Sequence, residues 1–189
     1  MHLRKNLPNY LTYFRIAVIP ALIVVYLWGH YVLKSELSAC LSAALFALAG
    51  ITDWLDGYAA RLWKAESNIG RFLDPIADKL LVATALLLLV SDGRADLLPA
   101  IAIVCREILV SGLREFLAEI RIGVPVSKLA KFKTAAQMAA IFFLLLGTPA
   151  WLFFLGRLLL WIAAGLTLVT GYAYLKTGLR HMARDAADR

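Results

Sequence analysis

Cysteine is almost absent from the chain, which has only Cys40 and Cys105, both inside apolar runs. Neither has a partner at a metal-ligand spacing, and two isolated cysteines give no disulfide framework. We therefore expect both to act as small apolar residues. The chain also lacks internal repeats, low-complexity stretches and a second domain, so we expect one domain over residues 1–189.

Charged residues are scarce as well, at 17% of the chain, whereas 61% of the residues are hydrophobic. A soluble domain would be apolar over only about half of its residues. The apolar runs have the length of helices and do not show the short alternation of barrel strands. The formal charge of +7 does not indicate nucleic acid, because basic loops of membrane proteins face anionic lipid headgroups. We predict an all-α membrane protein whose partners include membrane lipids.

Six apolar segments are predicted to span the membrane. The first two cover roughly 11–29 and 37–63. The third follows the turn at 64–68 and ends at about 90, and the last three cover roughly 97–119, 132–147 and 151–175. Pro75 disfavours helical geometry at Asp74, so the third helix either begins there or bends there. The first segment follows Arg4 and Lys5 as in a signal peptide, but it contains Arg15 and lacks a convincing cleavage site. We therefore treat it as the first span, with Arg15 reaching to the interface.

The distribution of lysine and arginine predicts the orientation. Sixteen of the 20 lie in the amino-terminal segment, at 61–79, at 114–133 and in the tail. The opposite turns hold only Lys34, Arg94 and Arg157. Because cytoplasmic loops carry the excess of positive charge, both termini are predicted to face the cytoplasm.

Carboxylates gather in the run from 53 to 78. Asp53 and Asp56 are three residues apart, and Asp74 and Asp78 are four apart, so each pair shares one helix face. If the two helices pack antiparallel, the pairs face each other. Four neighbouring carboxylates repel, and divalent cations are the usual remedy. A polar turn with solvated acids, the alternative, explains one or two of them but not two same-face pairs.

Small residues accompany the carboxylates. Gly57 and Ala60 continue the face of the first pair, and Gly70 precedes the second pair on its stripe. They leave room for a ligand against the helix backbone. Arg61 follows directly, and its guanidinium suits a phosphate.

Eight positions with their spacings resemble the signature of the CDP-alcohol phosphatidyltransferase family: Asp53, Asp56, Gly57, Ala60, Arg61, Gly70, Asp74 and Asp78. The resemblance implies a six-helix transmembrane bundle. In this family an alcohol hydroxyl attacks the lipid-bearing phosphorus of a CDP-linked lipid, and CMP leaves. The implied metal ligands are Asp53, Asp56, Asp74 and Asp78, with two Mg²⁺ or Mn²⁺ ions, and the implied general base is Asp78.

The resemblance also implies the contacts to the CDP-lipid. Gly57, Ala60 and Gly70 let the cytidine nucleotide approach, and Arg61 contacts the diphosphate. The segment 6–15 is similar to the amino-terminal signature of bacterial members of the family. It adds Asn9 and Thr12 near the nucleotide, and Asp56 completes the expected CDP-lipid site.

Basic residues form a second candidate group for the acceptor. Arg106, Arg114, Lys131 and Lys133 could converge on a second anion beside the metals, which favours a phosphorylated acceptor. Two alternatives stay open. The lysines could instead meet anionic lipid heads, and the charges at 106–107 and 114 could form structural ion pairs between helices. Because Arg106 and Glu107 are adjacent, we expect them to point in different directions.

Further segments favour one acceptor. Residues 70–79, 113–116, 124–127 and 131–138 resemble bacterial family members that act on CDP-diacylglycerol and sn-glycerol 3-phosphate in the inner membrane. The resemblance also implies a homodimer. A cardiolipin synthase of the family, with phosphatidylglycerol as acceptor, is the alternative.

Two other classes fit less well. A divalent-cation transporter would show repeats or broken helices at the membrane midplane, whereas these acids lie near the cytoplasmic end. An intramembrane prenyltransferase would need two acidic motifs far apart in sequence, and this chain has one compact motif.

Overall fold

The computed structural model describes residues 2–33, 35–63, 68–119 and 128–187, with side chains described over 12–32, 35–53, 73–119 and 129–179. These parts contain six α-helices, one short π-helix and no strand. The helices are α1 (His2–Trp28), η1 (Gly29–Leu33), α2 (Glu36–Trp63), α3 (Asn68–Ser91), α4 (Leu97–Glu119), α5 (Lys128–Leu146) and α6 (Ala150–Ala187). The predicted six-helix, all-α fold is confirmed.

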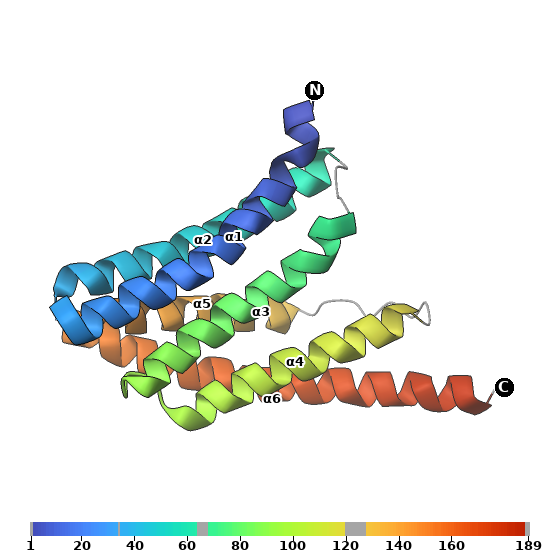
Figure 1. Cartoon of the computed structure of the whole chain (residues 1–189). Helices are drawn as coiled ribbons and strands as arrows, with labels where there is room; N and C mark the ends of the chain where they lie inside the picture. Colours follow the sequence, from blue (N-terminus) through green and yellow to red (C-terminus); the bar gives the residue numbers. More distant parts are fainter. Residues whose placement is uncertain (1, 34, 64–67, 120–127, 188–189) are drawn as a thin grey trace.

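The helices run back and forth, so that α1 begins and α6 ends at the same end of the bundle, α1 at the top and α6 at the right in Figure 1. We call this the site end; there α2, α4 and α6 end and α3 and α5 begin. The opposite, far end holds η1 and the turns at 92–96 and 147–149. Gly93 and Gly147 follow α3 and α5 there with φ of 70° and 72°, a conformation that glycine adopts at little cost.

Within the residues whose side chains are described, four helices are long and apolar enough to cross a membrane, over Thr12–Val32, Glu36–Asp53, Leu129–Leu146 and Ala150–Leu179. The chain is therefore a membrane protein. The other two, α3 and α4, have 24 and 23 residues, and about 20 suffice to span a bilayer. They carry charged residues in midcourse, among them Asp78 in α3 and Arg106 in α4. Such charges normally face the interior of a bundle.

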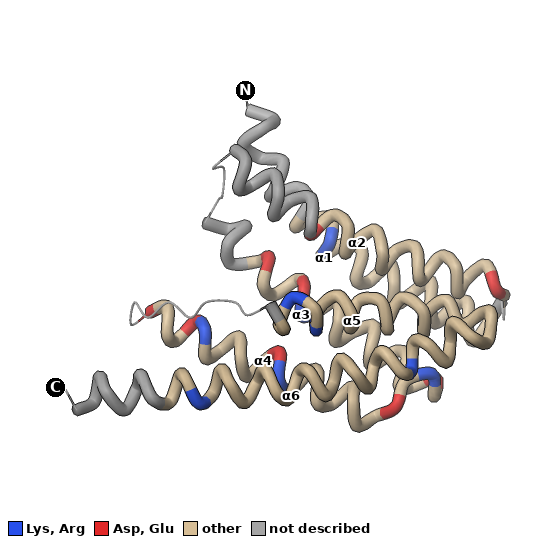
Figure 2. Tube along the Cα trace, turned by 180° about the vertical axis from the view of Figure 1, so that it is seen from behind, with Lys and Arg blue, Asp and Glu red and all other residues tan. Residues whose placement is uncertain are grey.

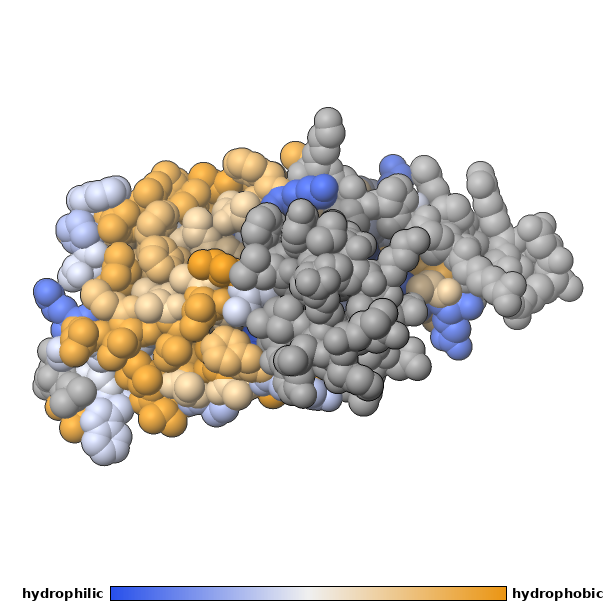
Figure 3. All heavy atoms as spheres, turned by 90° about the horizontal axis from the view of Figure 1, so that it is seen from above, coloured by the Kyte–Doolittle hydropathy of each residue, from blue (hydrophilic) through white to orange (hydrophobic). Residues whose placement is uncertain are grey.

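The bundle has a buried apolar core and an apolar exterior. Leu22, Phe46, Leu86, Ile103 and Ile141, from five different helices, are at most 1% exposed. Large apolar side chains are also exposed on most helices, and the described surface over α1 and α2 is mostly apolar in Figure 3. Polar residues gather at the left end of that view, the far end. This pattern suits lipid contact along the helices and water at the end.

Pro75 lies inside α3, seven residues after its start. The sequence left two possibilities for the third helix, and the structure shows that the helix begins well before the proline. Asp74 and Asp78 therefore sit on one continuous helix, one turn apart.

Candidate active site

An arginine of α1 joins two of the predicted site carboxylates. Arg15 Nη1 lies 2.9 Å from Asp53 Oδ1 on α2 and 2.8 Å from Asp78 Oδ1 on α3. The Arg15 side chain is 0% exposed, whereas the two aspartates are 42% and 48% exposed. The expectation that Arg15 reaches to the membrane interface is therefore wrong. Two carboxylates inside the bundle give the guanidinium stronger partners than the interface would.

Thr12 makes a second link between α1 and α3. Its buried hydroxyl donates a short hydrogen bond to Asp74 Oδ1. Thr12 and Arg15 are three residues apart on α1, and Asp74 and Asp78 are four apart on α3, so the two links lie one above the other. They fix the orientation of both α3 carboxylates. A contact of Thr12 with the nucleotide stays a prediction.

Several predicted residues lie outside the described side chains: Asn9, Asp56, Gly57, Ala60, Arg61 and Gly70. Among the side chains that are described, no three His, Cys, Asp or Glu residues are grouped so as to hold a metal ion. Asp53 and Asp78 nevertheless direct oxygen atoms at one cationic nitrogen. Two carboxylate oxygens that converge on a positive charge suit a hard divalent cation.

A cavity of about 590 Å³ lies beside these carboxylates, with Asp53 and Asp78 in its wall. The same wall contains all four residues predicted for the acceptor phosphate, namely Arg106, Arg114, Lys131 and Lys133. They come from α4 and α5, far from the aspartates in sequence. Figure 2 shows acidic and basic residues close together in this part of the bundle, between long stretches without charge.

Glu107 neutralises part of the basic group. It accepts a short bond from Lys133 Nζ and one of 3.2 Å from Arg106 Nη1. The expectation that Arg106 and Glu107 point apart is therefore wrong, because both side chains are long enough to bend toward each other. Lys133 is buried, so it does not face lipid heads. Arg114 and Lys131 have no ion-pair partner among the described residues.

Tyr174 and Gln137, which the sequence analysis did not single out, also line this cavity, and Thr170 supports it from behind Arg106. Arg106 Nη2 donates to Thr170 Oγ1 at 3.1 Å, and its guanidinium lies 5.8 Å from the centre of the Tyr174 ring. Gln137 is buried, and its Oε1 has no hydrogen-bond partner. The sequence offered one signal for Gln137, namely a glutamine within an apolar helix. A buried amide normally has a hydrogen-bond partner, so such a residue indicates a polar contact inside the bundle.

An apolar groove of about 450 Å³ between α2 and α5 adjoins the cavity. Phe46, Ile51 and Phe142 line the groove, and Gly50 and Met138 line both spaces. A Cβ on Gly50 would come within 2.8 Å of Met138 Cε. The cavity with its charged residues and the apolar groove thus meet at a position without a side chain.

Comparison with known proteins identifies the family of the chain. The family model for CDP-alcohol phosphatidyltransferase matches residues 5–169. The chain belongs to the CDP-alcohol phosphatidyltransferase family.

Its similarity to individual proteins is also extensive. A CDP-diacylglycerol–glycerol-3-phosphate 3-phosphatidyltransferase of Rickettsia felis is 47% identical over 180 residues, which is 93% of this chain and 97% of the relative. The Rickettsia bellii protein of the same name is 48% identical over the same shares. The Salmonella choleraesuis protein of that name is 42% identical over 90% of this chain and 93% of its own length.

Proposed function

We propose that this protein transfers the phosphatidyl group of CDP-diacylglycerol to sn-glycerol 3-phosphate, with release of CMP. The observation that carries the proposal is that one cavity holds both Asp53 and Asp78 and the basic residues of α4 and α5. Carboxylates with metals suit a diphosphate, and cations suit a phosphorylated acceptor. The names of the similar proteins support the same reaction.

The reaction needs one bond to form and one to break at the lipid-bearing phosphorus. The acceptor hydroxyl forms the new P–O bond, the P–O bond to CMP breaks, and the hydroxyl proton passes to Asp78. An ionised aspartate is a weak base, so its placement matters as much as its pKa. Arg15 and Thr12 supply that placement, because they hold the α3 carboxylates against α1.

Mg²⁺ or Mn²⁺, two ions by family resemblance, would be held by Asp53, Asp56, Asp74 and Asp78. When bound, these ions shield the diphosphate and stabilise the charge that develops on the leaving CMP. The CDP-lipid site would extend over Asn9, Thr12, Asp56, Gly57, Ala60, Arg61 and Gly70. The acyl chains would leave the cavity past Gly50 into the groove between α2 and α5.

The acceptor phosphate would bind Arg114 and Lys131, whose charges are not neutralised by a described acid. Lys133 and Arg106 would add hydrogen-bond donors from the buried side of the cavity. The unpartnered Gln137 Oε1 would accept a hydrogen bond from a glycerol hydroxyl.

We also infer the setting of the enzyme. The site end faces the cytoplasm of a bacterial inner membrane, where both substrates are available, because most lysine and arginine residues lie at that end. A homodimer follows from family resemblance.

The test is CMP release by purified protein in detergent with CDP-diacylglycerol, Mg²⁺ or Mn²⁺, and one acceptor at a time. We expect release with glycerol 3-phosphate and none with phosphatidylglycerol or glycerol. Release with phosphatidylglycerol alone would overturn the acceptor assignment. Asp78→Asn should bind CDP-diacylglycerol but be nearly inactive, and retained turnover would remove Asp78 from the role of base.

A further inference from the structure

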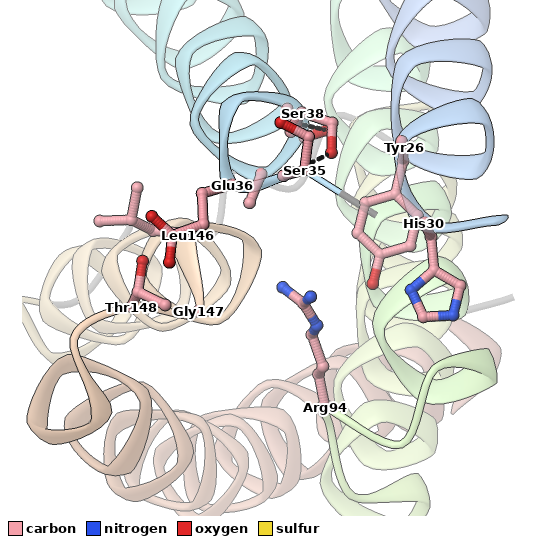
Figure 4. Close-up of a pocket in the computed structure, with 12 residues that line it drawn as sticks. Tyr26, His30, Ser35, Glu36, Ser38, Arg94, Leu146, Gly147 and Thr148 are labelled. Carbon is pink, nitrogen blue, oxygen red and sulfur yellow. Dashed lines mark hydrogen bonds between the residues drawn. The ribbon is translucent and has the colours of Figure 1, made fainter. Parts of the chain in front are cut away.

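A second cavity, of about 500 Å³, lies at the far end of the bundle, away from the catalytic residues. Figure 4 shows its lining, which comes from α1 and η1, the start of α2, the turn after α3 and the end of α5. Polar and charged residues in the lining include Tyr26, His30, Glu36, Arg94 and Thr148. The proposed reaction uses none of these groups.

Arg94 is held so that one of its nitrogen atoms remains available. Asp92 accepts bonds from Tyr26 Oη at 2.9 Å, His30 Nε2 at 3.0 Å and Arg94 Nε at 2.8 Å. Arg94 Nη1 donates to the Leu145 carbonyl at 3.3 Å. Nη2 has no partner among the described residues, and the guanidinium points into the cavity in Figure 4. The cavity therefore offers a fixed donor to an anionic group.

Glu36 gives the same cavity an unpaired negative charge. It lies in the first turn of α2, is exposed, and has no ion-pair partner in the described part of the chain. Ser38 and Ser42, which also line the cavity, already donate their hydroxyls to the Ser35 and Ser38 carbonyls, at 2.6 and 2.8 Å. They have only acceptor lone pairs left for a ligand. This side of the cavity suits a ligand with positively charged N–H donors.

An apolar groove of about 200 Å³ continues from the cavity between α1 and α2. Val24, Trp28 and Leu41 line it, and Gly29 and Ser38 line both spaces. A Cβ on Gly29 would lie 2.1 Å from Ser38 Cβ, so a side chain there would close the junction. Trp28 and Tyr31 are exposed beside it, as aromatic residues are at the level of lipid headgroups.

We propose that this far-end cavity binds the headgroup of a phospholipid with a primary ammonium, that is, a phosphoethanolamine headgroup, with an acyl chain in the adjoining groove. The phosphate contacts Arg94 Nη2, and the ammonium contacts Glu36 and the serine oxygens. An anionic headgroup without an ammonium would meet the Glu36 carboxylate without a compensating charge. A choline headgroup carries the charge but no N–H to donate. The lipid belongs to the leaflet opposite to the catalytic cavity.

The test is native mass spectrometry of the purified full chain with palmitoyl-oleoyl phosphatidylethanolamine, phosphatidylcholine or phosphatidylglycerol, each added at the same concentration. We expect the wild type to retain phosphatidylethanolamine best. Glu36→Gln should lower that retention about two- to fivefold, the upper part of the range for one exposed ion pair. Glu119→Gln, an exposed acid at the site end, is the matched control and should change nothing.

Glu36→Lys supplies the opposite sign and should shift retention from phosphatidylethanolamine to phosphatidylglycerol. Equal retention of the three lipids by the wild type would overturn the proposal, as would an unchanged lipid preference of Glu36→Gln. CMP release should stay at the wild-type level in both Glu36 variants, because Glu36 lies at the end opposite to the catalytic cavity. Unchanged CMP release would show that a Glu36 variant which loses the lipid is still folded.

Discussion

Replacement of Arg15 by methionine should make the site bind divalent cations more tightly while it destabilises the cation-free protein. Methionine keeps much of the buried side-chain volume but removes the charge between Asp53 and Asp78. Arg15 competes with a metal ion for these two carboxylates, because its Nη1 contacts an oxygen atom of each. Its removal therefore leaves a more negative site.

The magnitude follows from the geometry. Arg15 Nη1 lies 2.9 and 2.8 Å from the two carboxylate oxygens. A cation held by the same oxygens would therefore lie within about 6 Å of this nitrogen, where two unit positive charges repel by about 3 kcal/mol at an effective dielectric constant of about 20. Nearly half of each aspartate side chain is exposed, and water screening reduces the effect to about 1–2 kcal/mol. A change of about 1.4 kcal/mol corresponds to a tenfold change in cation affinity.

The assay is a thermal-unfolding titration of the purified protein with Mg²⁺ or Mn²⁺ in detergent, without lipid substrate. Arg15→Met should unfold at a lower temperature than wild type without cation, and its Tm should rise further as cation is added. The apparent dissociation constant should fall about tenfold. Arg15→Lys, which keeps the charge, should stay close to wild type.

The opposite result would refute this reasoning. If Arg15→Met binds the cation as weakly as wild type or more weakly, Arg15 is not a competitor for the carboxylates. An equal loss of affinity in Arg15→Lys and Arg15→Met would assign the guanidinium a shape-dependent role in the metal site.

Three further predictions concern separate parts of the molecule. Arg114→Ala should raise the KM for glycerol 3-phosphate about tenfold, as expected for one lost charged hydrogen bond, and leave the KM for CDP-diacylglycerol nearly unchanged. Both KM values are measured by steady-state CMP release, and an equal increase in both would contradict the acceptor assignment. Lys133→Met should lower the free energy of unfolding by about 1–3 kcal/mol because it removes a donor from Glu107, and Glu107→Gln in the same chain should recover part of this loss if the two residues are coupled. The hydrogen bond from Trp161 lowers the pKa of Asp96 below its usual value. The stability that this bond contributes is therefore present above the ordinary carboxyl pKa and is lost as pH falls through the lowered pKa. Asp96→Asn should show a smaller decrease of Tm than wild type between about pH 5 and 3, and an equal decrease in both proteins would exclude this contribution.

Helix number and most helix positions could be predicted from sequence because long apolar runs have few alternatives in a membrane. The predicted fourth segment, 97–119, coincides with α4. Pro75 shows the limit of local rules. A proline disfavours the helical state of its neighbour, yet α3 continues through it, and the sequence alone did not decide between a start and a bend.

The partners of charged residues could be predicted only in part. An arginine near the end of an apolar run is compatible both with reaching to the interface and with pairing inside the bundle. Arg15 pairs with Asp78, 63 residues away, and only the crossing of α1 and α3 decides this. Arg106 and Glu107 form an ion pair for a different reason. Helix geometry sets the direction of each Cα–Cβ bond, but the charged ends of long side chains can still bend toward each other.

The last helix has a consequence for the whole protein. With 38 residues, α6 is about 57 Å long, whereas the hydrocarbon core of a bilayer is about 30 Å thick. After Leu179 the sequence carries Arg180, His181, Arg184 and Asp185, and the helix continues to Ala187 at the same end as the amino terminus (Figure 1). The final turns of α6 therefore extend out of the membrane into water. A fluorophore fixed there would report, by energy transfer to dyes in either leaflet, which side of the membrane the catalytic cavity faces.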